Sequence, residues 1–247
     1  MKKLIAVLLF TLQSLVSVVA DEAVVSSWAP KVSIDSIVAS KYLAFGSGAV
    51  LYDAPVVQTG ITAAFQNGLW LNVWNSKSFN STWGKSFGDE VDYGVGWDTK
   101  VAGFGLSLTV TYFDEPLALI ESRNDILYTQ ILVSHEIGPV NARVYWKTYT
   151  PMPNSMYEGG HLFGFGLSKT VKPFSFVSMN GSADIRYDDG GFGLNSGFLT
   201  KCSFGFAWNV THKLSVTGPS IDLYIPMSVH DIRKTDKVIY GGLRYQF

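Results

Sequence analysis

The chain of 247 residues is short of cysteine, of charge and of long hydrophobic runs. Its one cysteine, Cys202, leaves an exported form of the protein without an internal disulfide. Charged residues make up 16% of the chain, against about 25% in an ordinary soluble domain. The net charge of −1 gives no nucleic-acid-binding surface. After residue 20 there is no run of about 18 apolar residues, so a membrane-spanning helix is excluded there. One cysteine and four scattered histidines also exclude the usual metal-ligand spacings, and we expect no cofactor.

The first 20 residues have the pattern of a secretory signal peptide. Two lysines precede an apolar run that begins at Leu4, and small residues lie near Ala20. Polar residues from Thr11 onward interrupt the run, which makes it too short for a membrane anchor. Residue 21 is an aspartate and not the cysteine of a lipoprotein. We expect cleavage after about Ala20 and export of residues 21–247 as a single domain.

The exported part alternates apolar and polar residues with period two, which is typical of β-strands. Within 90–99, for example, Val91 and Tyr93 fall on one face while Asp92 and Gly94 fall on the other. Such runs predict about twelve strands, at 32–45, 55–66, 69–77, 90–99, 103–114, 124–136, 139–150, 159–171, 175–188, 197–210, 213–225 and 236–247.

The connections between these strands alternate between tight and long. Asn67-Gly68 is a two-residue hairpin signal, whereas 78–89 and 115–123 are long connections. A soluble β-sandwich does not require its connections to alternate between short and long. An outer-membrane barrel has short periplasmic turns, longer outside loops and an even number of strands. We therefore predict an all-β, antiparallel barrel of about 12 strands in the outer membrane of a Gram-negative bacterium.

The last segment, GGLRYQF, carries the alternation to its end, with Leu243, Tyr245 and Phe247 on one face. In a closed barrel the last strand pairs with the first, so this strand has no free edge. The segment resembles the C-terminal signal of bacterial outer-membrane proteins. We thus expect the barrel-assembly machinery and periplasmic chaperones as partners during biogenesis, and outer-membrane lipid around the finished barrel. A C-terminal strand in a soluble barrel is the alternative.

In a membrane barrel the apolar face meets lipid and the polar face lines the lumen. The charged residues predicted for the lumen are nearly balanced in sign: Asp35, Lys41, Asp92, Asp98, Arg143, Lys147, Asp184, Arg186, Lys201, Asp222 and Arg244. This balance predicts either a narrow channel for small polar solutes with little charge selectivity, or an internal salt-bridge network that closes the barrel. Glycines on the same face, such as Gly94 and Gly166, either leave open space or relieve crowding.

No residue pattern favours catalysis, and we expect no enzyme activity. Ser134 and His135 are adjacent and so point to opposite faces of a strand, which is unsuitable for a Ser–His pair. His161, near Glu158 at a predicted outer rim, is the best remaining acid–base candidate. The alternatives to a channel are therefore a non-conducting structural or surface-interaction barrel and a soluble periplasmic lipocalin-like binder.

Four short stretches between residues 40 and 114 read SKYLAFGSG, PVVQTGITAAFQNGLWLNVWNS, GDEVDYGVGW and LTVTYFD. In this order they resemble the motifs of the proteobacterial exported family Gcw_chp. The matching positions are Ser40, Tyr42, Pro55, Gln58, Gly60, Gly68, Trp74, Ser76, Glu90 and Asp92. Phe45-Gly46 stands where members of the family often have Arg-Gly. The resemblance implies export and a β-barrel, and it implies no activity because the family is uncharacterised. It directs attention to Gln58, Trp74, Glu90 and Asp92 as lumen or rim residues.

Overall fold

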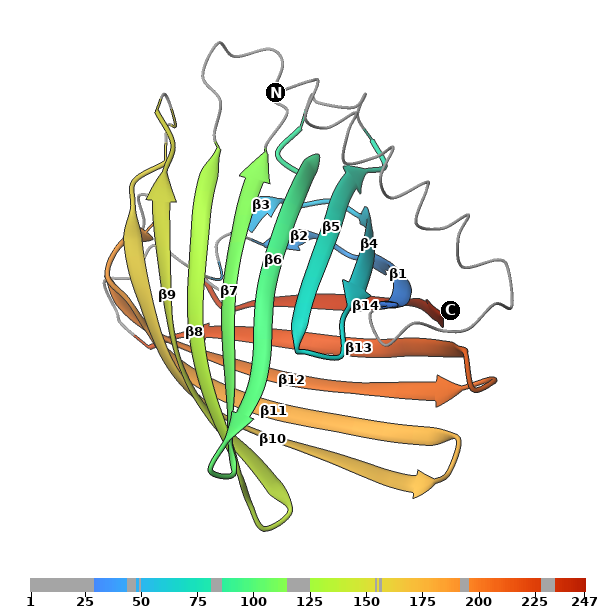
Figure 1. Cartoon of the computed structure of the whole chain (residues 1–247). Helices are drawn as coiled ribbons and strands as arrows, with labels where there is room; N and C mark the ends of the chain where they lie inside the picture. The colour runs from blue at the N-terminus through green and yellow to red at the C-terminus, as the bar shows by residue number, and fades with distance from the viewer. Residues whose placement is uncertain are drawn as a thin grey trace. The chain divides into compact units, whose positions relative to one another are not determined.

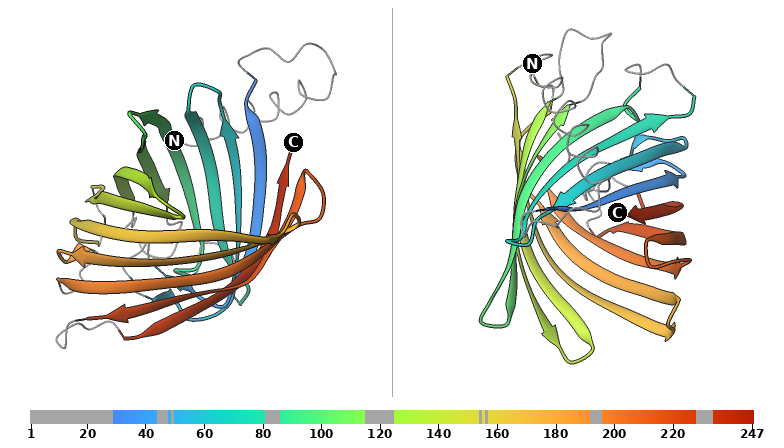
Figure 2. Two further views of the ribbon diagram at one scale, coloured as in Figure 1. Left: turned by 90° about the horizontal axis from the view of Figure 1, so that it is seen from below. Right: turned by 45° about the vertical axis from the view of Figure 1, so that its right-hand side comes forward.

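A computed structural model describes residues 29–43, 48, 50–80, 86–114, 125–153, 155, 157–191, 196–227 and 234–247. Twelve antiparallel strands in this part of the chain close into a barrel in the order β1-β14-β13-β12-β11-β10-β9-β8-β7-β6-β5-β4 (Figures 1 and 2). Within the same ranges, no helix is long and apolar enough to cross a membrane. The predicted antiparallel barrel of about twelve strands is confirmed.

The strand bounds follow the predicted ones closely. The barrel strands are β1 (Lys31–Ala39), β4 (Val56–Ala64), β5 (Leu69–Ser78), β6 (Glu90–Val101), β7 (Phe104–Asp114), β8 (Ile126–Ile137), β9 (Val140–Pro151), β10 (Gly160–Phe174), β11 (Val177–Asp188), β12 (Gly197–Asn209), β13 (Leu214–Pro226) and β14 (Asp236–Gln246). Two short strands, β2 (Tyr42–Leu43) and β3 (Val50–Tyr52), pair only with each other.

The first strand is the one whose predicted extent, 32–45, is wrong. β1 ends at Ala39, and the hydrogen bonds of Ser40 to Ile239, one through its N–H and one through its hydroxyl, end the pairing with β14. The chain then turns, and Tyr42 begins a separate hairpin. Apolar residues resume at Tyr42 after only two polar ones, so the hydrophobic pattern alone could not place the end of the strand.

The barrel closes where β1 pairs with β14. Asp35 lies opposite Arg244 in this ladder, and the N–H of Phe247 donates to the carbonyl oxygen of Val32 at 2.9 Å. β1 also pairs directly with β4, from Lys31 opposite Ala64 to Ala39 opposite Val56. Each barrel strand therefore has a partner on both sides, and no edge is left open.

The connections sort by length between the two ends of the barrel. One end, which we call the short-turn end, has the tight connections 65–68, 102–103, 138–139, 175–176 and 210–213. Gly68, Gly103 and Gly138 adopt positive φ in these turns, a conformation that favours glycine. The other end, the long-loop end, has the longer connections, including 79–89, 152–159 and 227–235.

The outward and inward faces of the barrel strands differ in polarity, as expected for a barrel in apolar surroundings. Exposed outward side chains are mainly apolar and include Val95, Phe104, Leu108, Val144, Phe163, Phe165, Ile185, Phe198, Phe204 and Leu243. Buried side chains of the inward face include Asp92, Asp184, Arg186, Asp188 and Asp222. A soluble lipocalin-like barrel would have the opposite arrangement, with apolar residues inside, so these faces argue against that alternative.

Outward aromatic side chains pair near the strand ends. Towards the short-turn end, Trp97 donates through Nε1 to the carbonyl oxygen of Asn67 at 3.0 Å, and the rings of Phe206 and Trp208 stack with centroids 6.0 Å apart. On the half of the barrel nearer the long loops, the rings of Tyr187 and Phe198 lie 5.1 Å apart. Aromatic side chains in such positions are typical of the girdles of membrane barrels.

Candidate functional site

The inner face of strands β9–β13 carries a group of ionised side chains, which we call the charged belt. Its members are Arg143, Asp184, Arg186, Lys201 and Asp222. Nη2 of Arg143 lies 2.7 Å from Oδ2 of Asp184, and Arg186 approaches the same carboxylate to 3.9 Å. Nζ of Lys201 lies 2.6 Å from Oδ2 of Asp222. Because Asp184 is almost fully buried, its two cations compensate a charge that has little contact with water.

Glycine makes the first of these ion pairs possible. Strand β10 separates Arg143 on β9 from Asp184 on β11, and Gly166 lies opposite both residues in the two ladders. A Cβ at Gly166 would collide with the Asp184 carboxylate and lie 2.9 Å from Nε of Arg143. Gly164 in the same strand lies beneath the ring of Tyr145. These inward glycines therefore relieve crowding, and the space over them is filled by side chains of adjacent strands.

Lys147 lies beside the charged belt without an acidic partner. Its Nζ lies 5.5 Å from the ring centre of Tyr128 and 5.3 Å from that of Tyr145, within cation–π distance of both. Among the residues that the structure describes, no carboxylate lies within ion-pair distance of Lys147. The inner face thus holds a partly buried ammonium group between two aromatic rings.

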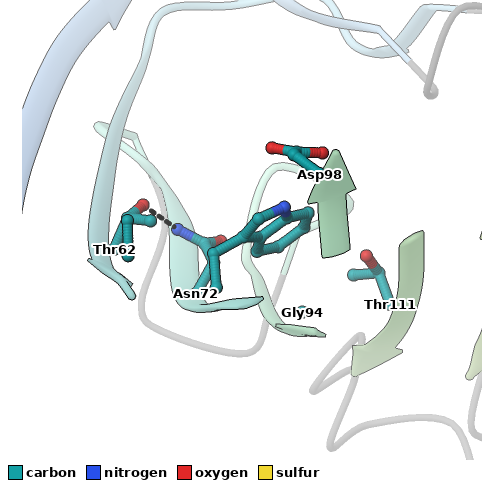
Figure 3. Close-up of a pocket in the computed structure, with 7 residues that line it drawn as sticks. Thr62, Asn72, Gly94, Asp98 and Thr111 are labelled. Atoms are coloured by element: carbon teal, nitrogen blue, oxygen red, sulfur yellow. Dashed lines mark hydrogen bonds between the residues drawn. The ribbon is translucent and has the colours of Figure 1, made fainter. Parts of the chain in front are cut away.

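Two cavities lie inside the barrel towards the short-turn end. The first, of about 410 Å³, is lined by Thr62, Ala64, Trp70, Asn72, Gly94, Asp98 and Thr111. Figure 3 shows these side chains, with Nδ2 of Asn72 donating to the Thr62 hydroxyl at 2.8 Å. The second, of about 390 Å³, is lined by Asp98, Thr99, Lys100, Gly105, Leu106, Ser107, Leu132 and Ser134. Asp98 is exposed and borders both cavities, so one carboxylate contacts the two of them.

At the long-loop end, the chain between β1 and β4 folds back inside the barrel. We call the described part of this connection, residues 41–43, 48 and 50–53, the inner hairpin. Tyr42 is buried, and its hydroxyl donates to Oε2 of Glu90 on β6 at 2.5 Å. The ring of Tyr42 also lies 6.1 Å from that of Trp74 on β5. Figure 1 shows β2 and β3 drawn behind β5 and β6.

The inner hairpin also reaches the opposite wall. A Cβ at Gly48 would lie 3.1 Å from Leu199 of β12 and 3.4 Å from Tyr224 of β13. One buried cluster accordingly contains Ala39, Tyr42, Val56, Leu199, Tyr224 and Val238. Side chains from the barrel wall and from the hairpin therefore pack together inside the barrel at this level.

Lys41 fixes the base of the inner hairpin. Its Nζ lies 2.8 Å from Asp53, within the hairpin, and 2.9 Å from Asp236 at the start of β14. The hydrogen bonds that Lys41 donates to these two carboxylates, first that to Asp53, raise the pKa of Lys41 above its usual value. The ion pairs link the hairpin to the barrel wall at its rim.

A second carboxylate is fixed next to the inner hairpin. Asp89 is fully buried just before β6, and its Oδ1 accepts hydrogen bonds at 2.9 Å from both the N–H and the hydroxyl of Ser78. Nζ of Lys77 lies 3.2 Å away. Burial acts to raise the pKa of Asp89, but the donors of Ser78 and Lys77 outweigh burial and hold it below its usual value. The sequence offered no signal for this group, because its donors come from the end of β5.

Five of the residues matched to the family motifs lie around this hairpin. Ser40 ties the end of β1 to β14, and Tyr42 bonds to Glu90. Gln58, Trp74 and Tyr42 share the lining of one cavity of about 250 Å³. Thus five positions spread over 51 residues of sequence, Ser40 to Glu90, lie in one region of the barrel. The motif residues were found from sequence, but the hairpin that brings them together was not.

Of the eleven charged residues predicted for the lumen, Lys41 lies in the inner hairpin and the other ten occupy inward-facing positions of barrel strands. They are Asp35, Asp92, Asp98, Arg143, Lys147, Asp184, Arg186, Lys201, Asp222 and Arg244. Arg244 pairs with Asp35 at 2.7 Å, away from the charged belt, and Asp98 lies at the short-turn cavities. The charges therefore form several local groups and not one continuous row.

Two of the described histidines lie on the outer surface of the barrel. His135 faces outward and stacks on Phe104 with centroids 4.6 Å apart, and His161 lies 5.7 Å from the outward ring of Trp146. In the described ranges, no three His, Cys, Asp or Glu side chains are grouped so that they could hold a metal ion. The arrangement of these residues offers ion pairs, aromatic faces and polar cavities, which suit passage or binding of polar solutes.

Comparisons with known proteins identify the fold and not a family. No family model and no curated protein sequence matches the chain. Among solved structures, the KdgM porin superposes with a TM-score of 0.57 at 10% identity, over 87% of this chain and 99% of the porin. The NanC porin gives a TM-score of 0.54 at 8% identity, over 88% and 100% of the two chains. An outer membrane channel from Pseudomonas putida F1 gives 0.51 at 12% identity, over 92% and 98%. The chain therefore has the 12-stranded barrel fold found in outer-membrane porins and channels.

Proposed function

We propose that the protein is an outer-membrane channel for small polar solutes, with little preference for either charge. The observation that carries the proposal is the inverted barrel: an apolar outer surface surrounds an interior of ion pairs and polar cavities. Burial of such an interior is unfavourable in free energy unless its polar groups are paired or in contact with water. A water-filled path meets that requirement.

The weak charge preference follows from the local pairing of the interior charges. Arg143 is matched with Asp184, Lys201 with Asp222, and Arg244 with Asp35. A pore that selects strongly by charge usually has an excess of one sign along its lining. The similarity to the KdgM and NanC porins supports a channel function for this chain.

The non-conducting barrel is the second candidate, and the inner hairpin favours it. The cluster around Tyr42, Leu199 and Tyr224 occupies part of the lumen towards the long-loop end. If this cluster never opened, the protein would be a structural barrel whose outer loops meet partners.

Single-channel recording of the refolded protein in a planar bilayer separates these candidates. We expect discrete current steps in KCl, with Asp98→Asn and Arg143→Gln shifting the ion preference in opposite directions. Asp98→Asn should favour anions because it removes an exposed carboxylate at two cavities. Lys237→Gln is the matched control, since Lys237 is exposed on an outward-facing position of β14. A barrel that inserts, runs as a folded species on gels and never conducts would contradict the channel.

A further inference from the structure

A row of residues from four neighbouring strands crosses the first cavity of the short-turn end. Thr62 on β4 lies opposite Asn72 on β5. Gly94 on β6 lies opposite both Asn72 and Thr111 of β7, and Figure 3 shows the row in this order from left to right. The volume of about 410 Å³ is within the range of about 300–1,000 Å³ that is typical of small-molecule sites. Every lining residue belongs to a barrel strand, so the wall itself holds the shape of the cavity.

The indole of Trp70 occupies space that two glycines leave beside this row. Gly96 lies opposite Trp70 in the ladder between β5 and β6. A Cβ at Gly96 would lie 2.2 Å from Cζ2 of Trp70, and a Cβ at Gly94 would lie 3.3 Å from Cζ3. One face of the six-membered ring therefore lies on the backbone of β6. Because Trp70 is only partly buried and lines the cavity, the opposite face of the indole borders the open space.

The polar groups around the indole keep hydrogen-bonding capacity that the protein does not use. Both hydrogens of the Asn72 amide are donated, to the Thr62 hydroxyl at 2.8 Å and to the carbonyl oxygen of Ile61 at 3.1 Å, which leaves Oδ1 as an acceptor. Within the part of the chain that the structure describes, the side chains of Thr111 and Asp98 make no hydrogen bond or ion pair. The cavity thus offers an amide oxygen, a hydroxyl and a carboxylate beside one aromatic face.

This combination of groups suits a pyranose ring better than an ion. The C–H groups on one face of such a ring pack against an indole, while the hydroxyl groups at its edge both donate and accept hydrogen bonds. Thr111 can donate, and Asn72 and Asp98 accept, whereas an ammonium or metal ion would use acceptors alone. The Asp98 carboxylate is the only charged group among the described lining residues, and its charge disfavours acidic sugars.

We propose that this cavity is a binding site for a neutral sugar, in which one pyranose ring stacks on Trp70 and bonds to Asn72 and Asp98. The inference rests on the proposed channel function, for which it names one class of small polar solute. A ring held in the cavity narrows the lumen, so the ion current falls while the sugar stays bound. Weak binding suits passage, because a solute has to leave its site as well as enter it.

Saturation-transfer NMR of the refolded protein with glucose measures binding without any need for conduction. The protein is kept in a polyoxyethylene detergent, because a detergent with a sugar head group would compete for the site. We expect saturation of the glucose C–H protons with the unaltered protein, and an apparent affinity about tenfold lower with Trp70→Ala. Trp97→Ala is the matched control, since Trp97 is exposed on the outside of the next strand and its loss should leave the affinity unchanged.

Two milder variants test the site without removing the indole. Thr111→Val keeps the shape of the side chain, removes its hydroxyl and should lower the affinity for glucose about threefold. Asp98→Asn should raise the affinity for glucuronate, a similar ring with a carboxylate, towards that for glucose, because the repulsion between the two carboxylates is removed. Binding of glucosamine without binding of glucose would overturn the assignment to a neutral sugar and indicate a cation site.

Planar-bilayer recording with added glucose separates failure of the site from failure of the channel. A current that glucose reduces in the unaltered protein but not in Trp70→Ala supports the sugar site. Conduction without glucose binding, or with equal binding by Trp70→Ala and the unaltered protein, overturns the site and leaves the channel standing. Glucose binding that is lost in Trp70→Ala, in a barrel that never conducts, supports the site and overturns the channel.

Discussion

Arg143 and Asp184 meet across strand β10, over the one position in that strand, Gly166, that lies opposite both of them. The carboxylate is 1% exposed, and the guanidinium donates to it through Nε and Nη2. The pair depends on the absence of a side chain in an intervening strand. Contacts of this type join strands that are not neighbours. They therefore stabilise the barrel wall in addition to the backbone hydrogen bonds between neighbouring strands.

Gly166→Ala should destabilise the barrel by about 1–3 kcal/mol, because the added methyl group overpacks the site and separates the buried pair. Urea unfolding in lipid vesicles, followed by tryptophan fluorescence, measures the change in the free energy of unfolding. Gly181→Ala on β11 is the matched control, since a Cβ there meets no atom within 4 Å. Equal losses in the two variants would show that the effect comes from the strand backbone and not from the ion pair.

The sequence was sufficient for the barrel because the barrel follows from local rules. Period-two alternation located the strands, and the contrast between Asn67-Gly68 and long segments such as 78–89 ordered them around the barrel. The inward positions of Asp184 and Lys201 follow from the same alternation. Each of these predictions needs only the residues within one strand or one turn.

The inner hairpin could not be predicted in this way. Tyr42 and Leu43 are apolar like the end of β1, and nothing local shows that Tyr42 leaves the wall to meet Glu90. The positions of the side chains over Gly164 and Gly166 could not be predicted either, because they depend on the register between strands. Register and tilt are properties of the closed barrel and not of any single segment.

Lys147 and Lys201 allow a test of how the interior charges are compensated. Lys147→Met should leave the free energy of unfolding unchanged or raise it, because Lys147 has two tyrosine rings and no carboxylate beside it. Lys201→Met should lower it by about 3 kcal/mol, because Asp222 then loses the ammonium group 2.6 Å away. Both changes remove one positive charge and keep a long side chain, so each controls for the other.

Urea unfolding of both methionine variants shows whether the two lysines contribute differently to the free energy of unfolding. If Lys147→Met were as destabilising as Lys201→Met, Lys147 would have to be stabilised by an anion or by water within the lumen. Ion selectivity in a bilayer then adds a second measure. Lys201→Met should shift the preference towards cations, because Asp222 then loses the ammonium group 2.6 Å away.

Trp70 and Trp97 provide a matched pair for the open end of the lumen. They lie on neighbouring strands, Trp70 opposite Gly96 and Trp97 opposite Leu69. Trp70 lies over Gly94 and Gly96 inside the cavity of about 410 Å³, whereas Trp97 is exposed on the outside.

Trp70→Ala should increase single-channel conductance, because the indole occupies space within a polar cavity that no other aromatic side chain lines. Trp97→Ala should leave conductance unchanged and weaken the barrel by about 1 kcal/mol, through loss of its hydrogen bond to Asn67. Planar-bilayer recording and urea unfolding measure the two effects on the same preparations. If Trp70→Ala did not change the current, the resistance of the channel would lie elsewhere. The cluster around Tyr42, Leu199 and Tyr224, near the opposite end of the barrel, would then be the next region to test by substitution.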